Sequence, residues 1–150
     1  MTQQLIDERR NLNRMAQDQL RAIKTLVGDQ GYSRTQEIRK DVHRAAALIH
    51  SYKELSKVGD EEDSNYQHAM RSNFNKSASL LGLPSVSQFD NSAEYIQLLK
   101  DKHTELSGLI QLEFPEQGDQ ILAHYAEYDR LTMQSTAIKI NMNSDYGRSV

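Results

Sequence analysis

The histidines are the residues of this chain with the widest chemical use, because imidazole can bind a metal ion or transfer a proton near neutral pH. His43 and His50 lie seven residues apart, so a helix would place them on one face, about 10 Å apart along its axis. A single ion cannot reach both, since a histidine–metal bond is about 2.1 Å long. His124 and Glu127 are one helical turn apart, but di-iron bundles use the reverse order, Glu-x-x-His, together with further glutamates. We predict no metal site and no bound cofactor.

His103 is the best candidate for a catalytic base or a pH switch. It lies four residues after Leu99 and three before Leu106, on the apolar stripe of a predicted helix. A histidine in such a position is more often neutral and hydrogen-bonded at the edge of a core than catalytic. We therefore predict that His103 is mainly buried and structural. An enzyme or metal protein built around His103, His124 and Glu127 is the second alternative function.

The sequence contains no motif that binds phosphate or activates a nucleophile. Its seven glycines are scattered at positions 28, 31, 59, 82, 108, 118 and 147, so no glycine-rich phosphate loop exists. There is no G-x-S-x-G, no H-E-x-x-H and no cysteine, which removes thiolate catalysis and disulfides. Glu113 and Glu116 flank Pro115 as a possible acid–base pair, but solvated charges at a helix end are the simpler interpretation. We expect no enzymatic activity.

Positive charge is concentrated in the first part of the chain. Residues 1–58 contain 11 Lys and Arg against 7 Asp and Glu, whereas residues 59–150 contain 7 against 14. Such an asymmetry suits self-association, orientation on a charged partner or closure of the chain on itself. The residues on the basic helical flanks that we predict to contact a partner are Arg10, Arg14, Arg21, Arg39 and His43.

The same basic flanks make nucleic-acid binding the first alternative function. Arginines on helices can contact phosphates, and Tyr32 or Tyr52 could stack on a base. Against this, acidic residues are interspersed among the arginines and the pI of the whole chain is near 5.9. Nucleic-acid-binding domains usually carry a denser basic surface.

Length and composition indicate one polar helical domain. The chain has 150 residues, 37% of them hydrophobic and 26% charged, with a mean hydropathy of −0.73. This is polar for a globular protein without predicting disorder, and it favours pairing with another copy or a partner. The N-terminus lacks the apolar segment of a signal peptide, and the longest apolar run, Ala45–Ile49, is far below the roughly 20 residues of a membrane helix. We expect a cytoplasmic protein with no membrane partner.

Helical periodicity predicts two long helices in the basic part, residues 1–58. Apolar residues recur at helical spacing over residues 3–27 and again over residues 33–55. The glycines of the segment Gly28–Gly31 separate the two helices, Ser33 caps the second, and Gly59 ends it. We expect the two helices to form an antiparallel hairpin.

The acidic part, residues 59–135, is predicted to contain three more helices. The first begins within the acidic run 60–64 and stops before Gly82, and the second begins at Asn91-Ser92. The third runs from Pro115 to about Met133. Residues 109–114 fit either a helix or a strand, because their apolar residues also alternate. Residues 136–150 show similar alternation and polar ends, which predicts an extended or disordered arm.

These patterns predict an all-α, elongated bundle of about five helices in one domain, residues 1–135, followed by the C-terminal arm. The function that we expect is non-enzymatic interaction or assembly, as a subunit or accessory factor of a larger complex, in the manner of small viral assembly proteins. The expected partner is a protein, either a second copy of the chain or a larger complex. Nucleic acid is the less favoured partner.

Overall fold

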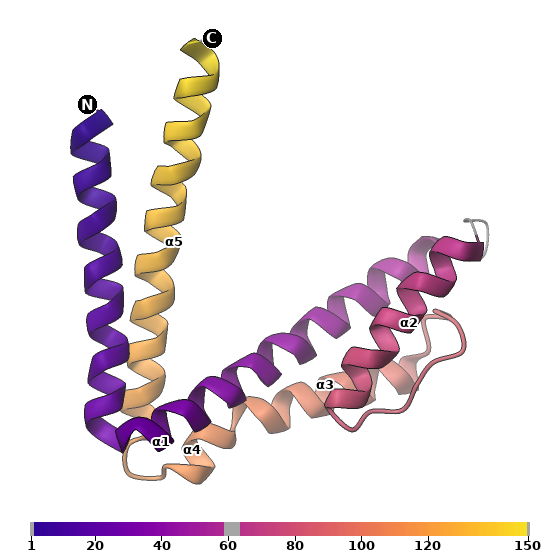
Figure 1. Cartoon of the computed structure of the whole chain (residues 1–150). Helices are drawn as coiled ribbons and strands as arrows, with labels where there is room; N and C mark the ends of the chain where they lie inside the picture. The colour runs from indigo at the N-terminus through magenta and orange to yellow at the C-terminus, as the bar shows by residue number, and fades with distance from the viewer. Residues whose placement is uncertain (1, 59–63, 150) are drawn as a thin grey trace. The chain divides into compact units, whose positions relative to one another are not determined.

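The computed structural model describes residues 2–58 and 64–149 and is almost entirely helical. Of the described residues 88% are helical and none lies in a strand. The helices are α1 (Thr2–Val58), α2 (Ser64–Leu80), α3 (Ala93–Ser107), α4 (Leu109–Glu113) and α5 (Gly118–Ser149) (Figure 1). The predicted all-α class is therefore confirmed.

The antiparallel hairpin predicted for residues 1–58 is wrong, because α1 continues through the segment that separates its two apolar stripes. Within α1 only Gly28 leaves helical backbone angles, with φ 77° and ψ 176°, and it produces a kink. A positive φ suits glycine, which has no Cβ to clash with the neighbouring carbonyl. The helix resumes at once, so Ser33, predicted to be a cap, lies inside it. One glycine is enough to kink a helix, whereas a hairpin needs a loop of several residues.

The described chain divides into two compact units, and α1 contributes to both. Unit 1 comprises Met1–Arg34 with Ile110–Val150, and unit 2 comprises Thr35–Leu109. The first part of α1 is thus a neighbour of α5, whereas the part after Arg34 is a neighbour of α2 and α3. The two parts of α1 therefore each pack against segments from later in the sequence.

The division into units also balances the charge asymmetry of the linear sequence. By sequence, unit 1 carries nine Lys and Arg against ten Asp and Glu, and unit 2 carries nine against eleven. Each unit combines a basic part of α1 with acidic segments from later in the chain. The uneven charge of the sequence suits self-association, orientation on a charged partner or closure of the chain on itself. The nearly equal charges within each unit favour closure.

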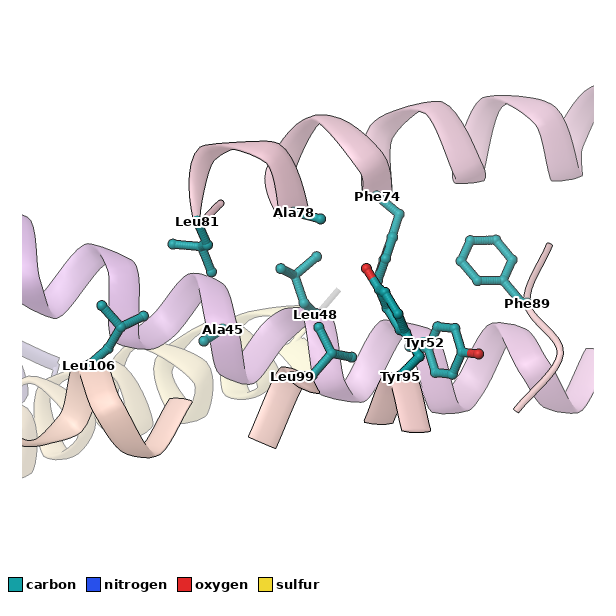
Figure 2. Close-up of a cluster of buried hydrophobic side chains, with 10 residues drawn as sticks. All are labelled: Ala45, Leu48, Tyr52, Phe74, Ala78, Leu81, Phe89, Tyr95, Leu99 and Leu106. Carbon is teal, nitrogen blue, oxygen red and sulfur yellow. The ribbon is translucent and has the colours of Figure 1, made fainter. Parts of the chain in front are cut away.

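Unit 2 has a core of three helices in which α1 lies between α2 and α3 (Figure 2). Its buried residues come from α1 (Ala45, Leu48, Tyr52), from α2 and the turn after it (Phe74, Ala78, Leu81), from α3 (Tyr95, Leu99, Leu106) and from the connector (Phe89). Neighbouring rings of the four aromatic residues lie 5.1–6.1 Å apart between centroids, in tilted or edge-on arrangements. Such geometries add to the free energy gained by burial. In a chain without tryptophan, this aromatic cluster is the main packing feature of unit 2.

The connector between α2 and α3 is held to the core by side-chain hydrogen bonds. Asn75 on α2 donates to the carbonyl of Val86 over 3.0 Å and accepts from its N–H over 2.8 Å. Tyr95 donates its hydroxyl to the carbonyl of Pro84 over 2.8 Å. Ser92 caps α3 by accepting from the N–H of Tyr95, as its position before the helix predicts. The predicted stop before Gly82 is also confirmed, because α2 ends at Leu80.

Unit 1 is built on an antiparallel pair formed by the first part of α1 and α5. Arg9 Nε donates to Ser135 Oγ over 3.2 Å, and His124 Nδ1 lies 2.7 Å from Gln19 Oε1. Between these two contacts the residue number rises by ten along α1 and falls by eleven along α5, so the two helices run antiparallel. Figure 1 shows the same arrangement, with the beginning of α1 and the end of α5 at one end of this unit.

The structure decides the predictions for residues 109–114 and for the start of the last helix, whereas the predicted start of the third helix lies outside the described residues. Residues 109–113 form the short helix α4, so the helical interpretation of this segment is the right one. The last helix begins at Gly118 and not at Pro115, because residues 115–117 form a turn. The acidic run 60–63 and Gly59 lie outside the described residues, and α2 begins at Ser64.

The C-terminal segment continues α5 as a helix through Ser149, so the extended arm predicted from residue 136 is wrong. Ile138 and Met142 alternate with Ile140 in sequence, but they also follow Leu131 and Ser135 at intervals of three and four residues. Leu131 and Ser135 are buried, and Ile138 and Met142 are half-buried. The helical period therefore explains the inner face of this segment, and alternation was the wrong period.

No helix in the described part of the chain combines the length and the apolar character that a membrane crossing requires.

Candidate interaction surface

The three residues considered for the second alternative function lie in different units, and two of them have other partners. His103 belongs to unit 2, whereas His124 and Glu127 belong to unit 1. His124 contacts Gln19, and Glu127 accepts two hydrogen bonds from the guanidinium of Arg130, which lower its pKa. Among the described residues, no group of three or more His, Asp or Glu side chains lies where it could hold a metal ion.

His103 is half-buried, not mainly buried as predicted. The buried residues of α3 are Tyr95, Leu99 and Leu106, and these define the centre of its inner face. His103 follows Leu99 by four residues and therefore lies about 40° to one side of it around the helix. Its spacing places it at the edge of the apolar stripe, where one side of the ring meets solvent.

Glu113 has a structural partner in unit 1. Arg34 Nε donates to Glu113 Oε1 over 2.7 Å, and Arg34 Nη2 donates to Oε2 over 2.6 Å. This two-point contact lowers the pKa of Glu113 and joins the first part of α1 to α4. Glu116, the other member of the suggested acid–base pair, is exposed in the turn before α5. The carboxylate of Glu113 is therefore positioned to stabilise the unit.

The five residues predicted to contact a partner do not share one unit. Arg10, Arg14 and Arg21 lie in unit 1, whereas Arg39 and His43 lie in unit 2. On the exposed side of α1, Arg10 pairs with Asp7 at 4.0 Å and Arg21 pairs with Asp18 at 2.5 Å. Arg14 donates to Asn11. This side of α1 in unit 1 is a charged surface whose arginines have partners within their own helix.

The seam between α1 and α5 combines apolar and polar layers. Its fully or nearly buried members are Ala16 and Ile23 from α1 with Ile121, Tyr125, Leu131 and Ser135 from α5. The contacts of Arg9 with Ser135 and of Gln19 with His124 place polar side chains between apolar ones. Polar pairs in such a seam favour one register over its neighbours at some cost in stability. The seam covers one face of each helix.

The opposite face of α5 carries a second apolar stripe, which we call the outer face of α5. It consists of Leu122, Ala126, Met133, Ala137 and Ile140. Met133 is 72% exposed and Ile140 is 58% exposed, while Ala126 and Ala137 are also exposed. Met133 lies about 200° around the helix from the buried Leu131, so nothing in the seam covers it. From Leu122 to Ile140 the outer face extends over about 27 Å.

The outer face of α5 was not predicted from the sequence, although its signal is present in the residues. The apolar residues after Leu122 recur at intervals of four, seven, four and three residues, which is the period of one helical face. Assigning residues 136–150 to an arm removed Ala137 and Ile140 from the helix and left Met133 without its neighbours. With α5 extended to Ser149 the five residues share one face, which Asp129 and Arg130 interrupt between Ala126 and Met133.

A second surface feature is a shallow hollow of about 650 Å³ along α2. It is lined by His68, Arg71, Ser72, Asn75, Lys76, Ser79 and Leu80. The helix contains no acidic residue, and no ion pair of Arg71 or Lys76 is seen among the described residues. Part of its polar lining is committed to structure, since Asn75 holds the connector. The hollow is therefore a modest cationic surface.

Comparison of the chain with models of protein families, with curated proteins and with solved structures finds no match.

Proposed function

We propose that this protein is a non-enzymatic interaction protein, a subunit or accessory factor of a larger assembly in the cytoplasm, and that it binds its partner through the outer face of α5. The observation that carries the proposal is that α5 exposes Met133, Ala137 and Ile140 on the side opposite the face that unit 1 covers. A helix that is apolar on both sides is usually packed on both sides. Contiguous exposed apolar surface on a protein of this size commonly marks an interface.

The arginine surface of α1 is a weaker candidate for this interface. Arg10 and Arg21 have acidic partners one turn away, so a charged partner would have to compete with existing pairs. Exposed ion pairs contribute little free energy, whether an arginine pairs within its own helix or with a charged partner. The outer face of α5 has no such competitor, because apolar side chains gain free energy whenever a partner removes them from water.

The test is photo-cross-linking in the cells that produce the protein. A photoreactive amino acid replaces Ala137 on the outer face of α5, and in a matched variant it replaces Arg14 on the charged side of α1. We expect a cross-linked product of higher mass from position 137 and little from position 14. Product from position 14 alone would move the interface to α1, and no product from either position would overturn the proposed function.

A second candidate function, nucleic-acid binding, is favoured by the hollow along α2 and not by the basic part of α1 where it was first predicted. Arg71 and Lys76 lie on a helix without acidic residues, and phosphates are the ligands that such side chains contact most often. Gel shifts at rising salt would test it. Two contacts predict a slope of log affinity against log salt of only about −2, and Arg71→Glu with Lys76→Glu should abolish the shift.

A further inference from the structure

We infer that unit 1 opens on its own, in a step that separates α5 from the first part of α1 and leaves unit 2 folded. The reverse does not hold, because the pairing of α5 with α1 requires a folded unit 2. The α1–α5 pair therefore acts as a conformational switch whose closed state depends on unit 2. This inference concerns the seam of unit 1, and it does not depend on what binds the outer face of α5.

The order of the two units along the chain gives the first argument. Unit 2 is the continuous segment Thr35–Leu109, whereas unit 1 consists of two segments that unit 2 separates. Contacts in the seam therefore join distant residues, Gln19 with His124 across 105 positions and Arg9 with Ser135 across 126. While unit 2 is unfolded, each of these contacts has to close a long flexible loop, and the entropy cost of that closure falls on the seam.

A folded unit 2 removes this cost by holding its two ends near each other. Ala45 on α1 and Leu106 on α3 are buried in one core cluster, and Leu109 packs against it. Figure 2 shows Ala45 and Leu106 at the same end of this cluster. Folding of unit 2 thus brings together the two points where the chain enters unit 1, and there Arg34 donates to Glu113. The core cluster itself draws only on the segment of unit 2, so unit 2 has no such dependence on unit 1.

The seam is also less completely packed than the core of unit 2. Unit 2 buries four aromatic rings against one another between its helices. In the seam, two long helices share one face, and the polar contacts of Arg9 and Gln19 lie among the buried residues. Leu12 and Ile138 on this face are only half-buried. Regions with fewer buried apolar contacts open at a lower cost in free energy, so the seam opens first.

Opening uncovers the inner face of α5, which the closed pair hides. On this face Ile121 is 0% exposed and Leu131 is 1% exposed. These side chains become accessible only in the open state, so any molecule that binds them shifts the population towards that state.

Thiol labelling of the full chain measures each opening separately, because the natural sequence contains no cysteine. Ala16→Cys places a thiol in the seam, and Ala78→Cys places one in the core of unit 2. The two natural alanines are 1% and 0% exposed, so a soluble thiol reagent reaches either position only after local opening. We expect Ala16→Cys to react at least about tenfold faster than Ala78→Cys, because the seam opens before the core of unit 2. Equal rates at the two positions would overturn the inference.

Two matched core substitutions, added to each cysteine variant, test the dependence of unit 1 on unit 2. Leu131→Ala in the seam destabilises only the closed state. It should speed labelling at both positions about 100-fold, because unit 2 unfolds only after the seam has opened. Leu99→Ala in unit 2 destabilises the closed and the open state equally, since unit 2 is folded in both. It should speed labelling at position 78 about 100-fold and leave position 16 unchanged.

The other outcomes contradict the inference. Faster labelling of both positions by both substitutions would mean that the whole chain unfolds in a single step. An effect of Leu131→Ala at position 16 alone would mean that unit 2 unfolds without opening the seam. If circular dichroism shows that an alanine variant has lost its helices, Leu131→Val and Leu99→Val replace the pair. The same pattern is then expected with changes of about fourfold, which corresponds to one buried methylene group.

Discussion

Tyr52 shows how one side chain can connect the core of unit 2 to its loop. Its ring is fully buried against Phe74 and Phe89, while its hydroxyl donates to Asp90 over 2.7 Å and accepts from the N–H of Ser92 over 2.9 Å. Burial and the hydrogen bond to Asp90 raise the pKa of the Tyr52 hydroxyl, so it stays protonated. The ring of Tyr52 is therefore packed inside the aromatic cluster and is not accessible for stacking on a base, the role suggested for it from the sequence.

Replacing Tyr52 with phenylalanine should therefore destabilise the protein while keeping its packing. Tyr52→Phe retains the ring but removes both hydrogen bonds of the hydroxyl, one of them to a carboxylate. We expect a loss of about 1–2 kcal/mol in the free energy of unfolding, measured by urea denaturation. Tyr66→Phe is the control, because Tyr66 is 47% exposed, and it should change stability little. Equal effects of the two substitutions would contradict the role assigned to the Tyr52 hydroxyl.

At the scale of the elements, α1 requires glycine at two positions for different reasons. Gly28 provides a positive φ, which other residues adopt only at a cost. Gly31 is buried, and a Cβ on it would lie 2.6 Å from Cβ of Val27 and 3.4 Å from the ring of Phe114. The close approach of Val27 and Phe114 therefore requires the absence of a side chain at position 31.

Gly31→Ala and Gly108→Ala should change stability in opposite directions. Overpacking at position 31 predicts a loss of about 1–3 kcal/mol, even though alanine favours helix. Gly108 has φ −95°, and an added Cβ would meet its nearest atoms at 3.8 and 3.9 Å, which is ordinary contact. Gly108→Ala should stabilise by about 0.4–1 kcal/mol, because it restricts the unfolded chain. Thermal unfolding of the two variants checks both signs, and a stabilised Gly31→Ala would refute the packing argument.

The pair that joins α1 to α4 should make unit 1 sensitive to acid. The hydrogen bonds from Arg34 lower the pKa of Glu113. They therefore add to the free energy of unfolding at pH values above the usual glutamate pKa of 4.5. This stabilisation is lost as the pH falls through the lowered pKa. The side chain of Arg34 is 43% exposed and that of Glu113 is 33% exposed. Solvent screening therefore limits the contribution of this pair to the free energy of unfolding to about 0.5–1 kcal/mol. Glu113→Gln should show this loss at neutral pH, and the difference from the natural protein should vanish in acid.

The control for the acid experiment is Glu116→Gln, three residues further along the chain and exposed. Urea denaturation at several pH values should give the same stability for this variant and for the natural protein at neutral pH. A difference between Glu113→Gln and the natural protein that persisted unchanged in strong acid would show that the effect comes from the shape of the side chain.

At the scale of the whole molecule, charge is distributed evenly between the two units despite its uneven distribution along the sequence. Each unit joins a basic part of α1 to acidic segments, which leaves nearly equal numbers of opposite charges in each. Long-range attraction to a charged partner is correspondingly weak. Apolar surface is then the stronger basis for association, and α5 provides it.

Added salt should therefore leave association through the outer face of α5 intact or strengthen it slightly. An interface of Met133, Ala137 and Ile140 gains its free energy from burial, which salt does not screen. Association through Arg10, Arg14 and Arg21 would instead weaken steadily as salt rises. Sedimentation of the protein with its partner at low and high salt distinguishes the two surfaces, and dissociation of the complex by salt would favour the arginines of α1.

Local signals in the sequence were sufficient for most helix boundaries in unit 2. The stop at Gly82 and the cap at Ser92 depend on residues within one or two turns of the helix end, so their effects can be read directly from the residues. The same reasoning failed at Gly28, where the glycine that marks a helix end also permits a kink. It failed for residues 136–149 as well, because alternation over a few residues fits more than one period.

The sequence by itself determined that the chain is helical, where most of its apolar stripes lie and that it lacks known catalytic motifs, because these properties depend on residues close together in the chain. Only the tertiary structure decided which stripe packs against which. It paired the first part of α1 with α5, more than 100 residues away, and so left the outer face of α5 uncovered. Helical period specifies the direction in which a side chain points, but burial depends on what lies in that direction, and that is decided by contacts between distant segments.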